Sequence, residues 1–397
     1  MRAAEPGFEG GSAPRQTSAL SSVAHPFRPP HAEECFCPEP ARIPQTFAYD
    51  GDIRGKAMDG IQCAAQVAPQ RSTQYSSLTR DLAPLELQAF SPGLTPLEWL
   101  HLGGIDYLGF AAAADEPFLQ DAELLATFAT VSGFFQRREE PGAHETWLRP
   151  LPRAYPYFVS SDMAYTRRYK GKTNEVFTQF LLNVAKFASD FRTVPWRQLR
   201  VFDPLCGGGT TLFLALALGA DVAGVERDIK DAETTAAFVE QYATENKIPL
   251  KAHAERLRNA GKGRRWLFQL GKSETRKLIL ATGDTRESPH LAAALGRPHL
   301  VVADFPYGVQ HLGPIEELAT EALPVWASML KPGGALAFSW DATRFGREKM
   351  APLVKAAGLK VVERPPYDRM VHRVDRVIKR RDVMVALPPA LPPEPVP

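Results

Sequence analysis

A glycine-rich turn, Asp203-Pro-Leu-Cys-Gly-Gly-Gly-Thr210, lies between an apolar run over residues 199–202 and a helical pattern over residues 210–218. Glycine accepts positive φ and lets the backbone come close to a ligand. In open α/β sheets, ligands bind at the carboxyl ends of the strands. A strand, a turn of this kind and a helix therefore predict a site for a nucleotide-type ligand at this turn.

The residues around the turn restrict the type of ligand. A dinucleotide fingerprint needs Gly-x-Gly-x-x-Gly, but Leu212 stands at the third glycine position. Asp203 would repel a pyrophosphate, whereas it suits a ligand that carries an ammonium and a sulfonium group. Glu226 follows the next apolar run and can accept both ribose hydroxyls. Asp284 follows a third run and can accept from an adenine amine, so the set predicts S-adenosyl-L-methionine (SAM).

A second turn, Ala303-Asp-Phe-Pro-Tyr-Gly308, follows the fourth strand-like run. Its residues suit methylation of an exocyclic amino group on a base, whose nitrogen is a poor nucleophile because its lone pair is delocalised into the ring. Asp304 and the carbonyl of Phe305 or Pro306 can accept the amino hydrogens, and Tyr307 offers a ring for stacking. The base must leave its stack to reach such a pocket.

These patterns predict three sets of site residues. We expect the catalytic residues to be Asp304, Pro306 and Tyr307. We expect the cofactor to be held by Asp203, Cys206, Gly207, Gly209, Thr210, Glu226, Asp284, Lys172 and Thr173. We expect the substrate to be contacted by Phe305, Gly308, His311, Arg264, Arg265 and Trp266.

Residues 159–387 resemble the class I SAM-dependent methyltransferases, and within them a group of RNA methylases that includes the THUMP-associated tRNA guanine-N2 methyltransferases. The glycine turn is similar to that group's Asp-Pro-x-Cys-Gly-x-Gly-Thr, and Asp304-Phe-Pro-Tyr-Gly308 to its Asp-x-Pro-Tyr/Phe-Gly. Tyr169-Lys-Gly-Lys-Thr-Asn-Glu175 resembles the segment that closes over the methionine end of the cofactor. Phe305 replaces the more usual proline, and no clear THUMP pattern precedes residue 159. The resemblance implies a SAM-dependent N-methyltransferase.

Local charge favours a nucleic-acid partner, RNA more than DNA. The net charge of the chain is only +2, but residues 247–277 hold ten Lys or Arg and two acidic residues. Trp266 and Phe268 lie inside this stretch, so it predicts phosphate contacts together with base stacking. A second basic group comprises Arg373, Arg376, Lys379, Arg380 and Arg381. A third comprises Arg167, Arg168, Lys170 and Lys172.

Alternating strand-like and helical runs over residues 159–387 predict an α/β fold, a Rossmann-like class I methyltransferase with a doubly wound, mainly parallel sheet. Residues 76–158 form a small α+β segment, with a strand at 106–110 and a helix at 121–135. Residues 1–75 are rich in proline and predict a disordered leader or an over-extended start. Residues 388–397 predict a disordered tail.

Composition excludes several other classes of protein. The chain has 397 residues and four cysteines, so it is not a disulfide scaffold, and the spacing of Cys35 and Cys37 predicts no metal site. No apolar run of about 18 residues predicts a membrane span. We therefore expect a soluble, cytoplasmic protein without a membrane partner.

Three functions fit the sequence. The first is an N-methyltransferase that acts on guanine N2 of tRNA or rRNA. The second is a DNA adenine-N6 or cytosine-N4 methyltransferase, which uses the same site but usually needs a target-recognition region. The third is a non-catalytic scaffold that binds SAM and RNA, and the intact Asp304 and Tyr307 count against it.

Overall fold

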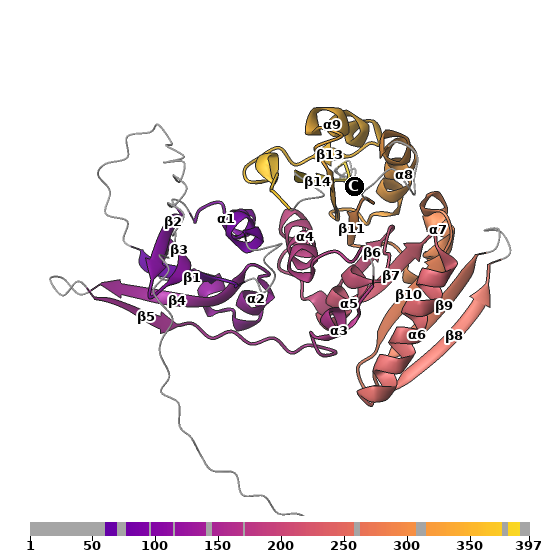
Figure 1. The fold of residues 1–397 in the computed structure, drawn as a ribbon, viewed down its shortest axis with the longest axis horizontal. Helices are drawn as coiled ribbons and strands as arrows, with labels where there is room; N and C mark the ends of the chain where they lie inside the picture. Colours follow the sequence, from indigo (N-terminus) through magenta and orange to yellow (C-terminus); the bar gives the residue numbers. More distant parts are fainter. Residues whose placement is uncertain are drawn as a thin grey trace, which may run out of the picture. The chain divides into compact units, whose positions relative to one another are not determined.

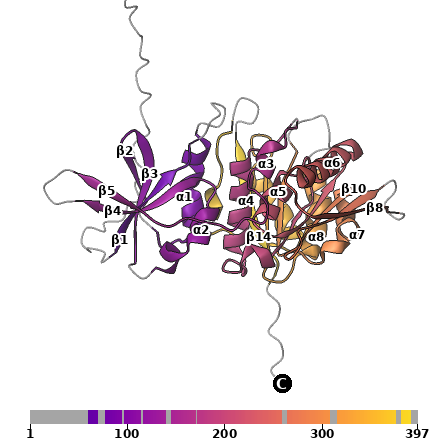
Figure 2. The same ribbon diagram turned by 90° about the horizontal axis from the view of Figure 1, so that it is seen from below.

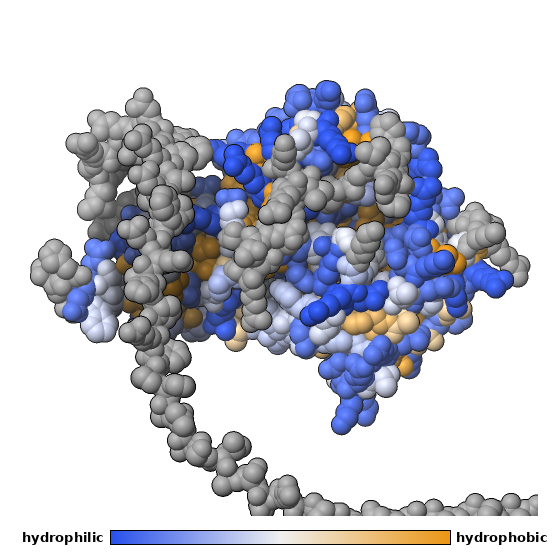
Figure 3. Space-filling model, viewed as in Figure 1, coloured by the Kyte–Doolittle hydropathy of each residue, from blue (hydrophilic) through white to orange (hydrophobic). Residues whose placement is uncertain are grey.

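The computed structural model contains two β-sheets with their covering helices (Figure 1). It describes residues 60–69, 77–94, 97–113, 116–139, 145–169, 171–257, 263–306, 315–374 and 380–389. Among these residues, no helix combines the length and the apolar character that crossing a membrane requires. The described surface is largely hydrophilic in the view of Figure 3, with only small apolar areas.

The first sheet is antiparallel, with the order β2-β3-β1-β4-β5. Its strands are β1 Ile61–Val67, β2 Glu98–Leu102, β3 Ile105–Ala112, β4 Val131–Glu139 and β5 Thr146–Pro150. Helices α1 (Leu78–Phe90) and α2 (Ala122–Thr127) accompany it. The strand predicted at residues 106–110 is confirmed as part of β3. These strands and helices together form a small α+β unit.

Two expectations for this segment are wrong. The leader predicted over residues 1–75 is too long, because Ile61–Val67 forms β1 at the centre of the sheet. The helix predicted over residues 121–135 ends at Thr127, and β4 begins at Val131. The carboxylate of Glu86 accepts the amides of Ala129 and Thr130 at 3.0 and 2.9 Å, so these amides are not available to continue the helix.

The second sheet has nine strands in the order β13-β14-β12-β11-β6-β7-β10-β9-β8. They are β6 Arg200–Asp203, β7 Asp221–Glu226, β8 Leu250–Arg256, β9 Arg264–Leu270, β10 Arg276–Thr282, β11 Leu300–Asp304, β12 Ala335–Asp341, β13 Lys360–Val361 and β14 Arg381–Leu387. The five central strands, from β12 to β10, are parallel. The predicted Rossmann-like α/β fold, with a doubly wound and mainly parallel sheet, is confirmed. The antiparallel hairpin β8–β9, within the basic stretch 247–277, was not predicted.

Helices cover both faces of this sheet. They are α3 Met163–Thr166, α4 Glu175–Ala188, α5 Thr210–Ala217, α6 Ile229–Glu245, α7 Ser288–Leu291, α8 Ile315–Met329 and α9 Arg347–Ala356. Side chains alternate along a strand, so Val302 of β11 joins the core beneath α4–α6, whereas Val301 joins the core beneath α7–α9. Figure 2 shows α6 and α8 on opposite sides of the sheet. Helix α4 buries Phe177, Phe180 and Leu181 against the core beneath α4–α6.

A buried polar cluster joins α1 to α4. Glu86 is fully buried, and its carboxylate accepts from the side-chain amide of Asn183 at 2.6 Å and from the hydroxyl of Thr130 at 2.5 Å. The same Asn183 amide donates to the carbonyl of Thr127 at 2.8 Å. A carboxylate away from water must have such donors, because an unsatisfied one costs several kcal/mol.

We expect Asn183→Ala to lower the free energy of unfolding by about 2–3 kcal/mol, because it removes donors from a buried carboxylate and a buried carbonyl. Denaturant titration followed by circular dichroism measures the change. Gln241→Ala, at an exposed position of α6, is the control and should change stability by less than about 0.5 kcal/mol. Equal losses in the two variants would contradict the role of the cluster.

Candidate functional site

The carboxyl edge of the nine-stranded sheet carries an acidic residue on each of four neighbouring strands. From β6 the chain adds β7 and β10 on one side and then returns to add β11 and β12 on the other. The order therefore reverses between β6, which ends at Asp203, and β11, which ends at Asp304. Glu226 ends β7, and Asp284 follows β10. Ligands of doubly wound sheets bind at such a reversal.

The glycine turn forms the floor of the site. Gly207 and Gly209 have φ of +50° and +88°, which other residues adopt only with strain, and the space beside the Gly207 Cα is open. Cys206 packs its side chain against Gly224 of β7, where an added Cβ would come within 2.7 Å of the sulfur. The Cys206 thiol therefore packs the turn onto the sheet, and only its backbone can face the cofactor predicted to bind here.

Asp203 is buried at the centre of the acidic edge, with 3% of its surface exposed. The pKa of its carboxyl is raised to about 7, chiefly by burial and also by the nearby carboxylates of Asp304 and Glu226. The hydroxyl of Thr211 and the amide of Leu205, which donates at 3.0 Å, act in the opposite direction. A buried carboxyl among other carboxylates favours a positively charged ligand.

Glu226 and Asp284 have carboxyl pKa values that are shifted in opposite directions. Glu226 accepts from the amide of Asp228 at 2.7 Å, and burial raises its carboxyl pKa. Asp284 forms a bidentate pair with Arg286, at 2.8 and 2.6 Å, and also accepts from the Arg286 amide, which together lower its carboxyl pKa. A carboxylate has about four lone-pair sites, so Asp284 retains one for the predicted adenine contact.

The segment before α4 lies over the glycine turn. The Tyr169 ring fills the position where a Cβ on Gly208 would stand, and its hydroxyl is 2.7 Å from that of Thr210. Lys172 donates to the carbonyls of Ala164 and Arg167 at 2.6 and 2.8 Å. It also pairs with the Glu175 carboxylate. Lys172 therefore fixes the shape of this segment, and nothing in its contacts directs its ammonium at the predicted cofactor.

Two hydroxyls hold the carboxylate of Asp304. Thr173 donates to Oδ2 at 2.7 Å, and Ser339 donates to Oδ1. Thr173 was predicted to hold the cofactor, but its hydroxyl is placed on the candidate catalytic residue. Ser339 was not predicted from the sequence. Ser339 is fully buried and lies beside Asp304 in the parallel register of β11 and β12, so its position near the carboxyl end of β12 was the available signal.

The second turn is described only as far as Pro306. Phe305 was predicted to contact the substrate, and this is wrong for its side chain, which is fully buried between Trp326 and Phe338 with ring centroids 5.5 Å away. The carbonyls of Phe305 and Pro306 are the remaining candidates for accepting an amino hydrogen. Tyr307, Gly308 and His311 lie outside the described residues, as do Cys35, Cys37 and Lys170.

The basic stretch 247–277 does not present the predicted stacking surface. Trp266 and Phe268 are 6% and 2% exposed, so the predicted stacking of a base on Trp266 is wrong. Arg265 pairs with Glu255 and donates to the carbonyl of Leu291, and Arg264 pairs with Glu233 at 3.0 Å. These residues lie on β9, which β10, β7 and β6 separate from β11. They lie on the adenine side of the predicted cofactor site rather than beside Asp304.

No protein-family model matches the sequence, and a comparison with characterised proteins finds no match. Among solved structures, TrmN from Thermus thermophilus is similar with a TM-score of 0.40 and 14% identity, over 83% of this chain and 100% of that one. An RNA methyltransferase from Salinibacter ruber in complex with S-adenosyl-L-homocysteine has a TM-score of 0.30 and 11% identity, over 57% and 99% of the chains. The fibrillarin pre-rRNA processing protein of Methanococcus jannaschii has a TM-score of 0.32 and 12% identity, over 65% and 90%.

Proposed function

We propose that this chain is a SAM-dependent methyltransferase that acts on the exocyclic amino group of a nucleic-acid base, with guanine N2 of tRNA or rRNA as the leading target. One observation carries the proposal. Asp203 and Asp304 end the two strands at which the sheet order reverses, and Asp304 is held there by Thr173 and Ser339. This arrangement supports the proposal of a cation site and an acceptor for amino hydrogens on neighbouring strands.

The residues of the site fit SAM. When bound, SAM supplies a methyl group on a positively charged sulfur. The buried carboxyl of Asp203 favours the positive charges of this cofactor, and the open space beside Gly207 lets the backbone approach it. Glu226 has the position for the ribose hydroxyls. Tyr169, above Gly208, lies where it can shield the methionine end from water.

In this proposal Asp304 orients the substrate. Its carboxylate accepts one hydrogen of the amino group, and the carbonyl of Phe305 or Pro306 accepts the other. The nitrogen lone pair then points at the methyl group, and catalysis is largely a matter of position. The hydroxyls of Thr173 and Ser339 fix the plane of the carboxylate before the substrate arrives.

Deletion of the gene tests the substrate class. We expect nucleosides from tRNA or rRNA of the deletion strain to lack one N2-methylguanosine by mass spectrometry. The wild-type gene should restore it, and the Asp304→Ala gene should not. Loss of N6-methyladenine or N4-methylcytosine from DNA would instead make the chain a DNA methyltransferase. Unchanged RNA and DNA nucleosides would contradict the enzymatic proposal and favour a scaffold.

A further inference from the structure

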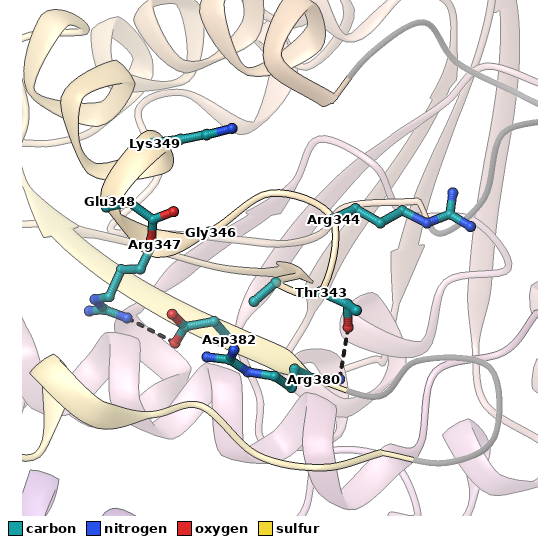
Figure 4. A pocket seen from close by; sticks show the side chains of 9 residues that line it. Thr343, Arg344, Gly346, Arg347, Glu348, Lys349, Arg380 and Asp382 are labelled. Carbon is teal, nitrogen blue, oxygen red and sulfur yellow. Dashed lines mark hydrogen bonds and ion pairs between the residues drawn. The ribbon is translucent and has the colours of Figure 1, made fainter.

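A polar hollow of about 340 Å³ opens where β12 ends and β14 begins (Figure 4). We call it the β12–β14 hollow. Its charged and polar lining comes from the turn after β12, the first turn of α9 and the start of β14, and it includes Thr343, Arg344, Glu348, Lys349, Arg380 and Asp382. Arg347 also lines it, so four basic residues stand against two acidic ones.

One ion pair forms the floor of the hollow. Arg347 donates to the buried Asp382 at 2.8 Å and to the carbonyls of Val383 and Tyr367 at 3.0 and 2.5 Å. The charges of this pair compensate each other, and Figure 4 shows the two side chains pointing at one another. The charge that the hollow offers to a ligand therefore comes from its other residues.

Three basic side chains remain around the opening. Lys349 and Arg380 are exposed, and Arg344 has 61% of its side chain exposed, with a long contact of 3.8 Å to Asp341. Glu348 is the one further acidic residue of the lining, and its carboxylate lies beside Gly346 at the start of α9. Three exposed cations against one exposed acid make the opening attractive to an anion with several oxygens.

The hollow lies on the catalytic side of the site. It opens at the same edge of the sheet as Asp304, because Asp304 pairs with Ser339 of β12, two residues before Asp341. Neighbouring strands are about 4.8 Å apart, so the start of β14 is only about 10 Å from the end of β11. When the base of a nucleotide contacts Asp304, its sugar–phosphate backbone can span this distance and reach the β12–β14 hollow. Arg264 and Arg265, by contrast, lie beyond the cofactor strands.

We propose that the β12–β14 hollow binds the phosphodiester backbone of the nucleic-acid substrate beside the base that is methylated. This inference rests on the proposed function and adds the surface that holds the substrate strand. Arg344, Lys349 and Arg380 each supply a positive group that displaces counterions from a phosphate. Phosphate contacts fix the register of a strand without reading its sequence, so the hollow positions the target nucleotide.

Charge reversal tests the hollow. We expect Lys349→Glu and Arg380→Glu each to weaken binding of an unmodified tRNA transcript about fivefold to tenfold at 100 mM salt, and to lower the salt slope by about 1. Lys360→Glu is the matched control, because Lys360 is exposed on β13, whose pairing with the end of β14 places it at the opposite edge of the sheet. Fluorescence anisotropy measures the affinities, and single-stranded DNA of the same sequence serves as a second probe.

SAM affinity measured by calorimetry should be the same in all three variants, which shows that each is folded. A weaker affinity of the Lys349 and Arg380 variants for either nucleic acid supports phosphate binding in the β12–β14 hollow. The probe that binds the wild type more tightly, RNA or single-stranded DNA, identifies which nucleic acid supplies the phosphodiester backbone. If Lys349→Glu and Arg380→Glu bind nucleic acid as tightly as Lys360→Glu does, and the chain methylates RNA normally, the inference about the β12–β14 hollow is wrong and the proposed function stands. An RNA affinity that depends on the hollow without any methylated base would overturn the proposed function alone.

Discussion

Asp304→Ala should reduce methyl transfer at least about 100-fold and leave SAM affinity within about threefold of the wild type. The carboxylate lies on β11, across the strand reversal from the glycine turn that we assign to the cofactor. Its loss removes the acceptor that would orient the amino nitrogen, and the methyl donor keeps its own contacts. Single-turnover transfer of labelled methyl groups to RNA measures the first effect, and calorimetry the second.

Two milder substitutions test whether the hydroxyls around the Asp304 carboxylate contribute to methyl transfer. Ser339→Ala and Thr173→Val each remove one of the hydroxyls that hold Asp304, so transfer should fall about tenfold in each and further in the double variant. These are positioning residues, so the defect should appear in the rate of transfer and not in SAM affinity. A fully active Asp304→Ala variant would remove Asp304 from the mechanism.

The acidic residues at the carboxyl edge of the nine-stranded sheet could be predicted from the sequence, because each is recognised from its immediate neighbours in the chain. Asp203, Glu226 and Asp304 each follow an apolar run, and carboxyl ends of parallel strands meet at one edge. The contact of Thr173 with Asp304 was outside such reasoning, because it joins residues that are 131 positions apart. Neither residue type nor spacing indicates that a threonine before a helix will meet a strand end formed so much later in the chain.

The errors have a common physical origin in burial. Phe305 and Trp266 have residue types that suit base stacking, but the alternation of the strands turns both into the core. The basic stretch 247–277 has high local charge, but the hairpin β8–β9 pairs Arg265 with Glu255 across its two strands. The high charge and aromatic content of this stretch therefore belong to a hairpin. Its tertiary packing, which the sequence does not show, decides which charged and aromatic side chains are available to a ligand.

SAM binding should weaken about tenfold between pH 8 and pH 6, since the pKa of Asp203 is raised to about 7 by burial. Below that pH the carboxyl of the free protein is mostly protonated, whereas a cationic ligand requires the ionised form. Glu226, whose pKa is also raised by burial, acts in the same direction. Calorimetry in buffers of different ionisation enthalpy should detect proton release on binding near pH 7.

Asp203→Asn should remove most of this pH dependence and lower SAM affinity at pH 8 by about 100-fold, because it deletes a buried charge opposite a cation. The stability of the same variant without SAM tests the raised pKa of Asp203 independently of cofactor binding. An acid whose folded pKa lies above its ordinary value of 3.8 costs stability as the pH rises from 3.8 through 7. The cofactor-free variant should therefore be more stable than the wild type at pH 8, on the order of 4 kcal/mol. A variant that binds SAM as tightly as the wild type would contradict the cofactor site, and one with lower stability would contradict the shifted pKa.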